Sequence, residues 1–278
     1  MTHIETHHRD SRFAVGPESR RLRRGIYLLP GLLTVANLLC GYFAILATLK
    51  GSAADLDNAA RAIGFAILFD MLDGRVARAT NTNSDFGKEF DALADIVSFG
   101  IAPAFLSFVW GMRGLLVSGS SEAHWVYQLG WLVTFGFVTC CAWRLARFNV
   151  HGMASGGSRY FAGLPTPAAA GGIAAVVHAF WSPIQDWRAS LLWLLWVLGL
   201  ALLMLSTVRY AGFKDVRWRR RVPSIAIVVL ALLVGAIVFY SELTLLLIAV
   251  IYVLHGLVMQ ALRFLRHRHA GRIESGDA

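Results

Sequence analysis

The stretch that decides the fold runs from Asp70 to Asp95. It reads Asp70-Met-Leu-Asp73-Gly74-Arg-Val-Ala77-Arg78, then eight residues, then Gly87-Lys-Glu-Phe-Asp91-Ala-Leu-Ala-Asp95. Its four aspartates form two pairs, the first at spacing i, i+3 and the second at spacing i, i+4. Residues at these spacings lie on one face of a helix. Each pair is therefore predicted to share a face of its own helix, with residues 80–87 as the turn between the two helices.

Both pairs lie at the edge of long apolar stretches, and the apolar run 62–69 ends directly at Asp70. Carboxylates at membrane depth are costly, so they mark a functional site by default. Two facing pairs of hard oxygen ligands suit one or two Mg²⁺ or Mn²⁺ ions, and such ions suit chemistry on phosphate. The alternative is that the carboxylates only cap helices or pair with nearby arginines. The small residues between them, Gly74, Ala77 and Gly87, make that alternative hard to sustain.

The composition indicates a membrane protein with a single domain. Of 278 residues, 56% are hydrophobic and only 15% are charged, whereas soluble domains carry about 25% charged residues. The three cysteines lie in apolar segments and are interpreted as small buried hydrophobic residues, and the nine histidines show no metal-binding spacing. The net charge of +9 does not indicate nucleic-acid binding, because the basic residues cluster beside predicted span ends, where they suit anionic lipid headgroups.

The fold is predicted to be an all-α polytopic membrane bundle. A bilayer core needs about 20 apolar residues per helix, and eight segments fit: approximately 26–49, 60–79, 90–110, 125–147, 165–182, 189–208, 222–240 and 243–264. Residues 1–19 are polar, contain no signal-peptide core and are expected to be disordered. Residues 20–265 are expected to form the membrane-embedded domain, and residues 266–278 a polar C-terminal tail.

The distribution of basic residues predicts the orientation. With the N-terminus inside and eight crossings, 22 of the 26 Lys and Arg residues fall on the inside, and only Lys50, Arg61, Arg113 and Arg188 fall outside. Positively charged loops stay in the cytoplasm. Both termini and all four aspartates are therefore predicted to face the cytoplasm, from a position in the cell (inner) membrane.

The spacing Asp-x2-Asp-Gly-x2-Ala-Arg-x8-Gly-x3-Asp-x3-Asp also resembles the signature of the CDP-alcohol phosphotransferase family, at all eight fixed positions. The resemblance implies transfer of a phosphatidyl group from a CDP-linked lipid to an alcohol, with release of CMP and with two Mg²⁺ or Mn²⁺ ions. It implies that Asp70, Asp73, Asp91 and Asp95 bind the metals and that Asp95 is also the general base. Seven further residues are expected to contact the CDP-lipid: Asn37, Gly74, Ala77, Arg78, Thr80, Ser84 and Gly87. Asn37 could instead bond only to a neighbouring helix.

Three further stretches resemble the phosphatidylserine-forming branch of this family. They are residues 91–104, 144–149 and 160–167, and residues 205–214 are similar to the same branch. The resemblance implies CDP-diacylglycerol and L-serine as substrates and a homodimer as the assembly. An arginine fork suits a carboxylate, so Arg144 and Arg147, with Asn149, are expected to bind the acceptor. These arginines could instead only anchor the helix at the headgroups.

Two other interpretations stay open at this point. The same chemistry could use glycerol 3-phosphate, inositol or choline, because two arginines would also suit a phosphorylated acceptor. Intramembrane carboxylates also build cation pathways, so a cation transporter is a candidate of another class. Transporter sites tend to lie at mid-bilayer between repeats. The predicted location of these aspartates, at the cytoplasmic ends of two helices, disfavours a transporter.

Overall fold

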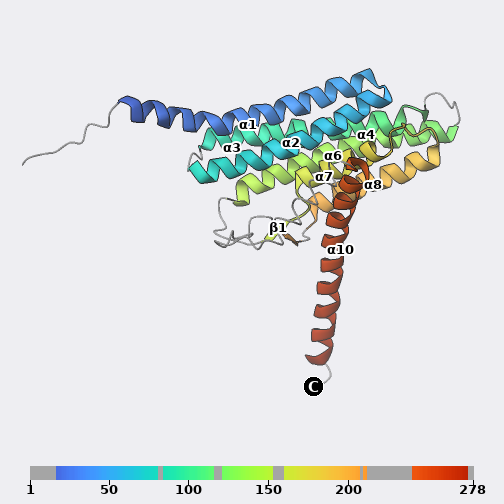
Figure 1. The fold of residues 1–278 in the computed structure, drawn as a ribbon. Helices are drawn as coiled ribbons and strands as arrows, with labels where there is room; N and C mark the ends of the chain where they lie inside the picture. Colours follow the sequence, from blue (N-terminus) through green and yellow to red (C-terminus); the bar gives the residue numbers. More distant parts are fainter. Residues whose placement is uncertain are drawn as a thin grey trace, which may run out of the picture.

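The fold is a bundle of long helices, seen in a computed structural model that describes residues 17–80, 84–115, 121–152, 160–206, 209–211 and 240–274 (Figure 1). In chain order the elements are α1 (Pro17–Lys50), α2 (Ala53–Thr80), α3 (Asp85–Asp95), the π-helix η1 (Ile96–Ile101), α4 (Ala102–Met112), α6 (Ser121–Gly152), β1 (Tyr160–Ala162), α7 (Thr166–Ala179), α8 (Trp187–Leu205), β2 (Arg209–Ala211) and α10 (Ser241–Glu274).

Local sequence explains where the first helices begin and end. Gly51 follows α1 with φ of +73°, a conformation that glycine adopts without penalty, and the chain reverses there into α2. Ser52 then accepts a hydrogen bond of 3.1 Å from the backbone N–H of Asp55. Ser84 caps α3 in the same way, accepting a 3.0 Å bond from the N–H of Gly87. Such caps satisfy N–H groups that the first helical turn leaves free.

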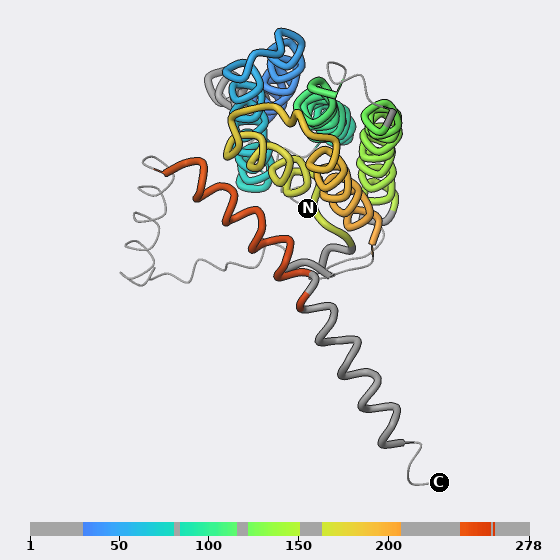
Figure 2. Tube along the Cα trace, turned by 90° about the vertical axis from the view of Figure 1, so that its right-hand side faces the viewer, coloured from blue at the N-terminus to red at the C-terminus, as the bar shows by residue number. Residues whose placement is uncertain are grey.

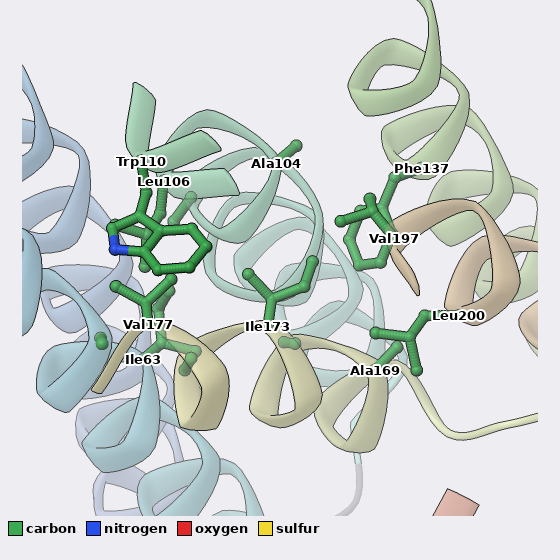
Figure 3. Packing of buried hydrophobic residues seen from close by; sticks show 14 of the residues in the cluster. Ile63, Ala104, Leu106, Trp110, Phe137, Ala169, Ile173, Val177, Val197 and Leu200 are labelled. Atoms are coloured by element: carbon green, nitrogen blue, oxygen red, sulfur yellow. The ribbon is translucent and has the colours of Figure 1, made fainter. Parts of the chain in front are cut away.

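The core lies between α2, α4, α6, α7 and α8, as Figure 3 shows. The short helix α7 occupies its centre, because small residues let neighbouring helices approach closely. A Cβ added at Gly172 would lie 3.2 Å from Leu200 of α8, and one at Gly171 would lie 3.2 Å from Ile67 of α2. Trp193 of α8 donates from Nε1 to the carbonyl of Ser107 in α4 at 3.0 Å, which joins these two helices across the core.

The apolar outer surface agrees with a multi-pass membrane protein. Within the described residues, four helical stretches are long and apolar enough to cross a bilayer: Pro30–Lys50, Asp85–Met112, Glu122–Val150 and Trp187–Leu205. Large apolar side chains stand exposed along these stretches, among them Leu39, Trp131, Trp143 and Leu192. Exposed apolar area of this extent marks a surface that contacts something other than water.

The remaining predicted spans have different outcomes. The helix α2 forms over 60–79 as predicted. Because it carries charged residues near both ends, it is not among the four stretches that are apolar enough to cross a bilayer. The helix α7 matches 165–182 in place, but it has only 14 residues, about 21 Å of helix against a bilayer core of about 30 Å. The predicted span 222–240 lies almost entirely outside the described residues, as do residues 1–16 of the predicted disordered tail; α1 already begins at Pro17.

Two features differ from an all-helical bundle of parallel spans. First, β1 and β2, of three residues each, pair antiparallel, with Phe161 opposite Tyr210; this short pairing is an addition to the predicted all-α class, which is confirmed. Gly163 follows β1 with φ of +87°, and a Cβ there would lie 2.3 Å from the carbonyl oxygen of Met204. Second, α10 runs across the bundle instead of along it (Figures 1 and 2). Its first half packs on α7.

Candidate metal and substrate site

The site forms where α2 and α3 turn back on each other, with α1 packed against both. The helix α2 ends at Thr80 and α3 runs from Asp85 to Asp95, and their side chains meet where Asp70 of α2 lies close to Asp91 and Asp95 of α3. This arrangement brings together the aspartate pairs that lie about 20 residues apart in the sequence. The two predicted helices form, but the turn between them is shorter than the predicted 80–87, because Thr80 still belongs to α2 and residues 85–87 already belong to α3.

Three of the four aspartates converge on one point. Asp70, Asp91 and Asp95 each offer a carboxylate oxygen, and these three oxygens lie within 4.8 Å of one another. Asp95 is only 8% exposed, and the other two are partly buried. Within the described residues, no Lys or Arg forms an ion pair with any of them. Three partly desolvated carboxylates without a counter-charge repel one another.

Asp73 is arranged differently from the other three aspartates. It is 6% exposed and accepts a hydrogen bond from the hydroxyl of Thr34 in α1. It lies outside the group of three oxygens, although it remains within electrostatic range of Asp91. The sequence pattern treats all four aspartates alike, whereas in the structure the side chain of Asp73 is held by α1.

The donor set fits a hard divalent cation. Mg²⁺ and Mn²⁺ prefer carboxylate oxygens, and a bound ion would remove the repulsion among the three carboxylates. One further observation points the same way: Oδ1 of Asp91 is buried and has no hydrogen-bond partner among the described residues. Buried polar atoms nearly always have a partner, so this oxygen is available to a ligand.

The residues expected to contact the CDP-lipid fall into two groups. Gly74 faces open space, since a Cβ added there would meet nothing closer than the Arg78 guanidinium at 4.0 Å. Arg78 is exposed and Ala77 half-buried on the same helix end. This surface leaves room for a bulky ligand beside the last turns of α2.

Thr80, Ser84 and Gly87 form the second group, and each has a local structural role. The Thr80 hydroxyl donates to the carbonyl of Val76 at 2.8 Å. Ser84 caps α3, and a Cβ added at Gly87 would lie 3.0 Å from its Oγ. The local bonds explain why these residue types occur here, and contact with the nucleotide stays a prediction for all three.

Asn37 lies at the heart of the site, on α1. It is completely buried, and its Nδ2 donates to Oδ1 of Asp95 at 3.1 Å. Its own Oδ1 has no partner among the described residues. The hydroxyl of Ser98 in η1 donates to the backbone carbonyl of Asn37 at 3.0 Å, which fixes α1 against the segment that follows Asp95.

Arg144 is the residue for which the two interpretations of the predicted arginine fork can be separated. Its side chain is on α6, only 8% of the residue is exposed, and its Nε has no partner among the described residues. It interacts electrostatically with Cys141, Arg147 and Tyr252 and, most weakly, with Asp95. An arginine that only anchored its helix at the headgroups would extend its guanidinium into water, so burial contradicts that interpretation for Arg144. Arg147 and Asn149 are half-buried.

Sequence reasoning missed three residues that build the site. Thr34 holds Asp73, Ser98 holds the backbone at Asn37, and Gly41 lets η1 approach α1, since a Cβ there would lie 2.4 Å from Oγ of Ser98. A signal was present: Thr34, Asn37 and Gly41 stand at spacings of three and four in an otherwise apolar helix, which puts them on one face.

Comparisons with known proteins agree with this geometry. Residues 27–204 match the CDP-alcohol phosphatidyltransferase family. The chain is 32% identical over 210 residues to a CDP-diacylglycerol–serine O-phosphatidyltransferase of Helicobacter pylori, covering 74% of this chain and 81% of the relative. It is 31% identical over 246 residues to the Mycobacterium bovis protein of the same name, covering 84% and 79%.

A third relative comes from an archaeon. It is the archaetidylserine synthase of Methanothermobacter thermautotrophicus, 36% identical over 185 residues, which cover 66% of this chain and 69% of the relative. The family match covers more than half of the chain and includes all four aspartates, Asn37 and Arg144. The chain belongs to the CDP-alcohol phosphatidyltransferase family.

Proposed function

We propose that this chain transfers the phosphatidyl group of CDP-diacylglycerol to the hydroxyl of L-serine, forming phosphatidylserine and releasing CMP. The observation that carries the proposal is a buried guanidinium, Arg144, that interacts with Asp95, one of three grouped carboxylates that have no ion-pair partner within the described residues. The carboxylates suit a cation-dependent reaction on a diphosphate, and the guanidinium suits an acceptor that carries a carboxylate. Relatives named for transfer to serine support the same acceptor.

The chemistry follows from what each residue can do. Asp95 accepts the proton of the serine hydroxyl, as a buried carboxylate next to the reacting atoms can. The hydroxyl oxygen then forms a bond to the phosphorus of the phosphatidyl group, and the bond from that phosphorus to CMP breaks. A divalent cation held by Asp70, Asp91 and Asp95 would neutralise the diphosphate charge. Asp73, held by Thr34, completes the negative site close to Asp91.

The nucleotide binds beside the turn between α2 and α3 in this proposal. Gly74 and Ala77 leave the backbone of α2 accessible, and the exposed Arg78 can bind a phosphate oxygen there. Arg147 and Asn149 lie one turn or more beyond Arg144 on α6 and complete the acceptor end. The space above Gly74 and the burial of Arg144 support this division of the site into a nucleotide end and an acceptor end.

The chain crosses the inner cell membrane eight times in this proposal, with both termini and the aspartates on the cytoplasmic side. Four apolar stretches within the described residues and the distribution of basic residues support a multi-pass arrangement with this orientation. Residues 20–265 form the catalytic domain between two polar tails, and the assembly is a homodimer.

Single cysteines introduced in the segment 212–221 should react with an impermeant thiol reagent only in opened cells. Labelling of these cysteines in intact cells would show that the orientation is the opposite of the one proposed.

Release of CMP tests the proposed reaction. Purified protein with CDP-diacylglycerol and Mg²⁺ or Mn²⁺ should release CMP only when L-serine is added, and phosphatidylserine should form in equal amount. Asp91→Asn serves as the inactive control. Product formation with glycerol 3-phosphate or inositol, but not with serine, would refute serine as the acceptor and would still support phosphatidyl transfer as the reaction. Cation transport into vesicles without CMP release would overturn both.

A further inference from the structure

The starting observation is that Asn37 is completely buried and that, among the described residues, its amide nitrogen has a hydrogen-bond partner whereas its amide oxygen has none. An asparagine side chain has two N–H donors and an acceptor oxygen. Here Nδ2 faces Oδ1 of Asp95 at 3.1 Å, while Oδ1 has no partner in the described part of the chain. The opposite amide orientation would set two oxygens against each other, so the assignment of the two atoms is fixed by Asp95. The orphaned atom is therefore an acceptor that needs a donor.

Asn37 and Arg144 approach Asp95 from different helices. On the α1 side, Gly41 packs directly on Ser98 of η1, one turn beyond Asp95. On the α6 side, a Cβ at Gly100 would lie 3.2 Å from Sγ of Cys141, and Arg144 follows Cys141 by one turn. Asp95 thus has on either side of it, among the residues that the structure describes, an acceptor without a partner on one helix and a donor without a partner, Nε of Arg144, on another.

The depth of Asn37 separates it from the nucleotide end. Thr34 of α1 bonds to Asp73, which is one turn closer to the end of α2 than Asp70. Asn37 lies one turn beyond Thr34 and bonds to Asp95 at the last position of α3, far from the turn at Ser84. Gly74 and Ala77, where the nucleotide has room, lie on the other side of Asp70. Asn37 therefore lies away from the nucleotide end, beside Asp95, where Arg144 also interacts.

We propose that Asn37 is a specificity residue for the amine of the acceptor, with its Oδ1 accepting a hydrogen bond from the ammonium group of an amino-alcohol acid. This inference rests on the proposed function. Arg144 binds the carboxylate and Asp95 takes the hydroxyl proton, so the ammonium is the acceptor group that remains to be bound. A site built around a buried hydrogen-bond partner rejects an analogue that lacks the matching group, because the protein atom is then left unsatisfied.

The test compares L-serine with 3-hydroxypropanoate, which has the same carboxylate and hydroxyl and no amine. The wild-type protein should prefer serine in kcat/KM. Asn37→Leu should reduce that preference by about 10- to 100-fold, the usual range for one hydrogen bond to a charged group. Asn37→Asp keeps an acceptor oxygen but sets its second oxygen against Oδ1 of Asp95, so it should slow both substrates while keeping the preference for serine. Thr34→Val is the matched control on the same face of α1, and it should slow both substrates equally.

Each outcome decides the proposal. An equal loss for both substrates in Asn37→Leu would show that Asn37 only positions Asp95, and would overturn the proposal. If Asn37→Leu does not accumulate, loss of the preference in Asn37→Asp would overturn it instead. If the analogue turns over too slowly, its inhibition constant against serine gives the same ratio. A wild-type protein that releases CMP with neither compound refutes the proposed function itself, and this inference with it.

Discussion

Two buried polar clusters in the same bundle are built on opposite principles. In the cluster around Asp57, both carboxylate oxygens have partners: Nδ1 of His178 on one, and the Arg61 guanidinium at 2.8 Å on the other. His178 in turn shares a 3.0 Å hydrogen bond between its Nε2 and Oγ of Ser241. In the cluster of Asp70, Asp91 and Asp95, carboxylates face one another, and no basic residue in the described ranges pairs with them.

The difference in hydrogen-bond and ion-pair partners indicates that the Asp57 cluster stabilises the fold, whereas the group of Asp70, Asp91 and Asp95 binds a ligand. The Asp57 cluster links α2, α7 and the start of α10, and each of these polar groups has a partner in the protein. Buried polar networks of this kind stabilise one arrangement of helices. The aspartate group opposes folding through desolvation and repulsion. An arrangement that costs stability and keeps orphaned atoms is expected where a ligand supplies the missing partners. The predictions that follow contrast the two clusters, starting with the largest effect.

Asp95→Asn should lower kcat by about 10²- to 10⁴-fold, the usual contribution of a general base. Binding of CDP-diacylglycerol should change much less, because Asp70 and Asp91 can still hold a cation beside the diphosphate and the nucleotide surface at Gly74 is unaltered. The measurement is a steady-state assay with a separate binding titration of the CDP-lipid. Loss of lipid binding, with normal turnover of the bound fraction, would assign Asp95 a structural role only.

His178→Ala should destabilise the fold by about 3–5 kcal/mol, since it leaves the buried carboxylate of Asp57 without one of its partners. The protein that remains folded should keep its transfer rate, because the cluster does not contact the site. Unfolding in detergent, monitored alongside activity per folded molecule, checks both parts. Ser241→Ala is the milder control, with an expected loss of about 1 kcal/mol. A lost transfer rate in fully folded His178→Ala would show that the two clusters are coupled.

Arg144→Lys should raise the KM for serine by about 10- to 100-fold, because the ammonium keeps the charge and loses the two-pronged geometry. The KM for CDP-diacylglycerol should change little. Arg147→Lys is the comparison variant on the more exposed turn, and its effect should be smaller. Equal effects of Arg144→Lys on both substrates would place the guanidinium on the diphosphate instead.

Thr34→Val should lower kcat/KM by about 2- to 10-fold, through loss of one hydrogen bond to the Asp73 carboxylate. The substitution keeps the shape of the side chain but leaves the buried Asp73 carboxylate without its hydroxyl partner, so the free energy of unfolding should fall by about 1–3 kcal/mol. Activity measured over a range of Mg²⁺ concentrations would show whether Asp73 also acts through the cation. An unchanged Thr34→Val protein would mean that Asp73 needs no orientation from α1.

The sequence alone predicted the aspartate helices, because both pairs and their turn lie within 26 consecutive residues. Local spacing carries that information. It also placed Arg144 on a helix near the end of the fourth predicted span, which is confirmed, but it left the burial of this side chain undecided. Burial distinguishes an anchor from a ligand-binding residue, and it depends on helices far away in the chain.

The features that escaped prediction depend on contacts between distant segments. His178 lies 121 residues from Asp57 and 63 from Ser241, and no periodicity connects them. The pairing of Phe161 with Tyr210 joins two three-residue strands across two helices. The division of the four aspartates into a group of three and an Asp73 held by Thr34 depends on α1, which packs beside both helices of the motif.

Thermal unfolding with and without Mg²⁺ or Mn²⁺ tests most directly the claim that the unpaired carboxylates are a cation site. A ligand that binds only the folded state stabilises it by about 2.7 kcal/mol at 100 times its Kd. The wild-type protein should therefore unfold at a higher temperature with the cation, and Asp57→Asn should show the same upward shift from a lower starting point. Asp91→Asn should show none. An equal shift in Asp91→Asn, or no shift in the wild-type protein, would contradict the account.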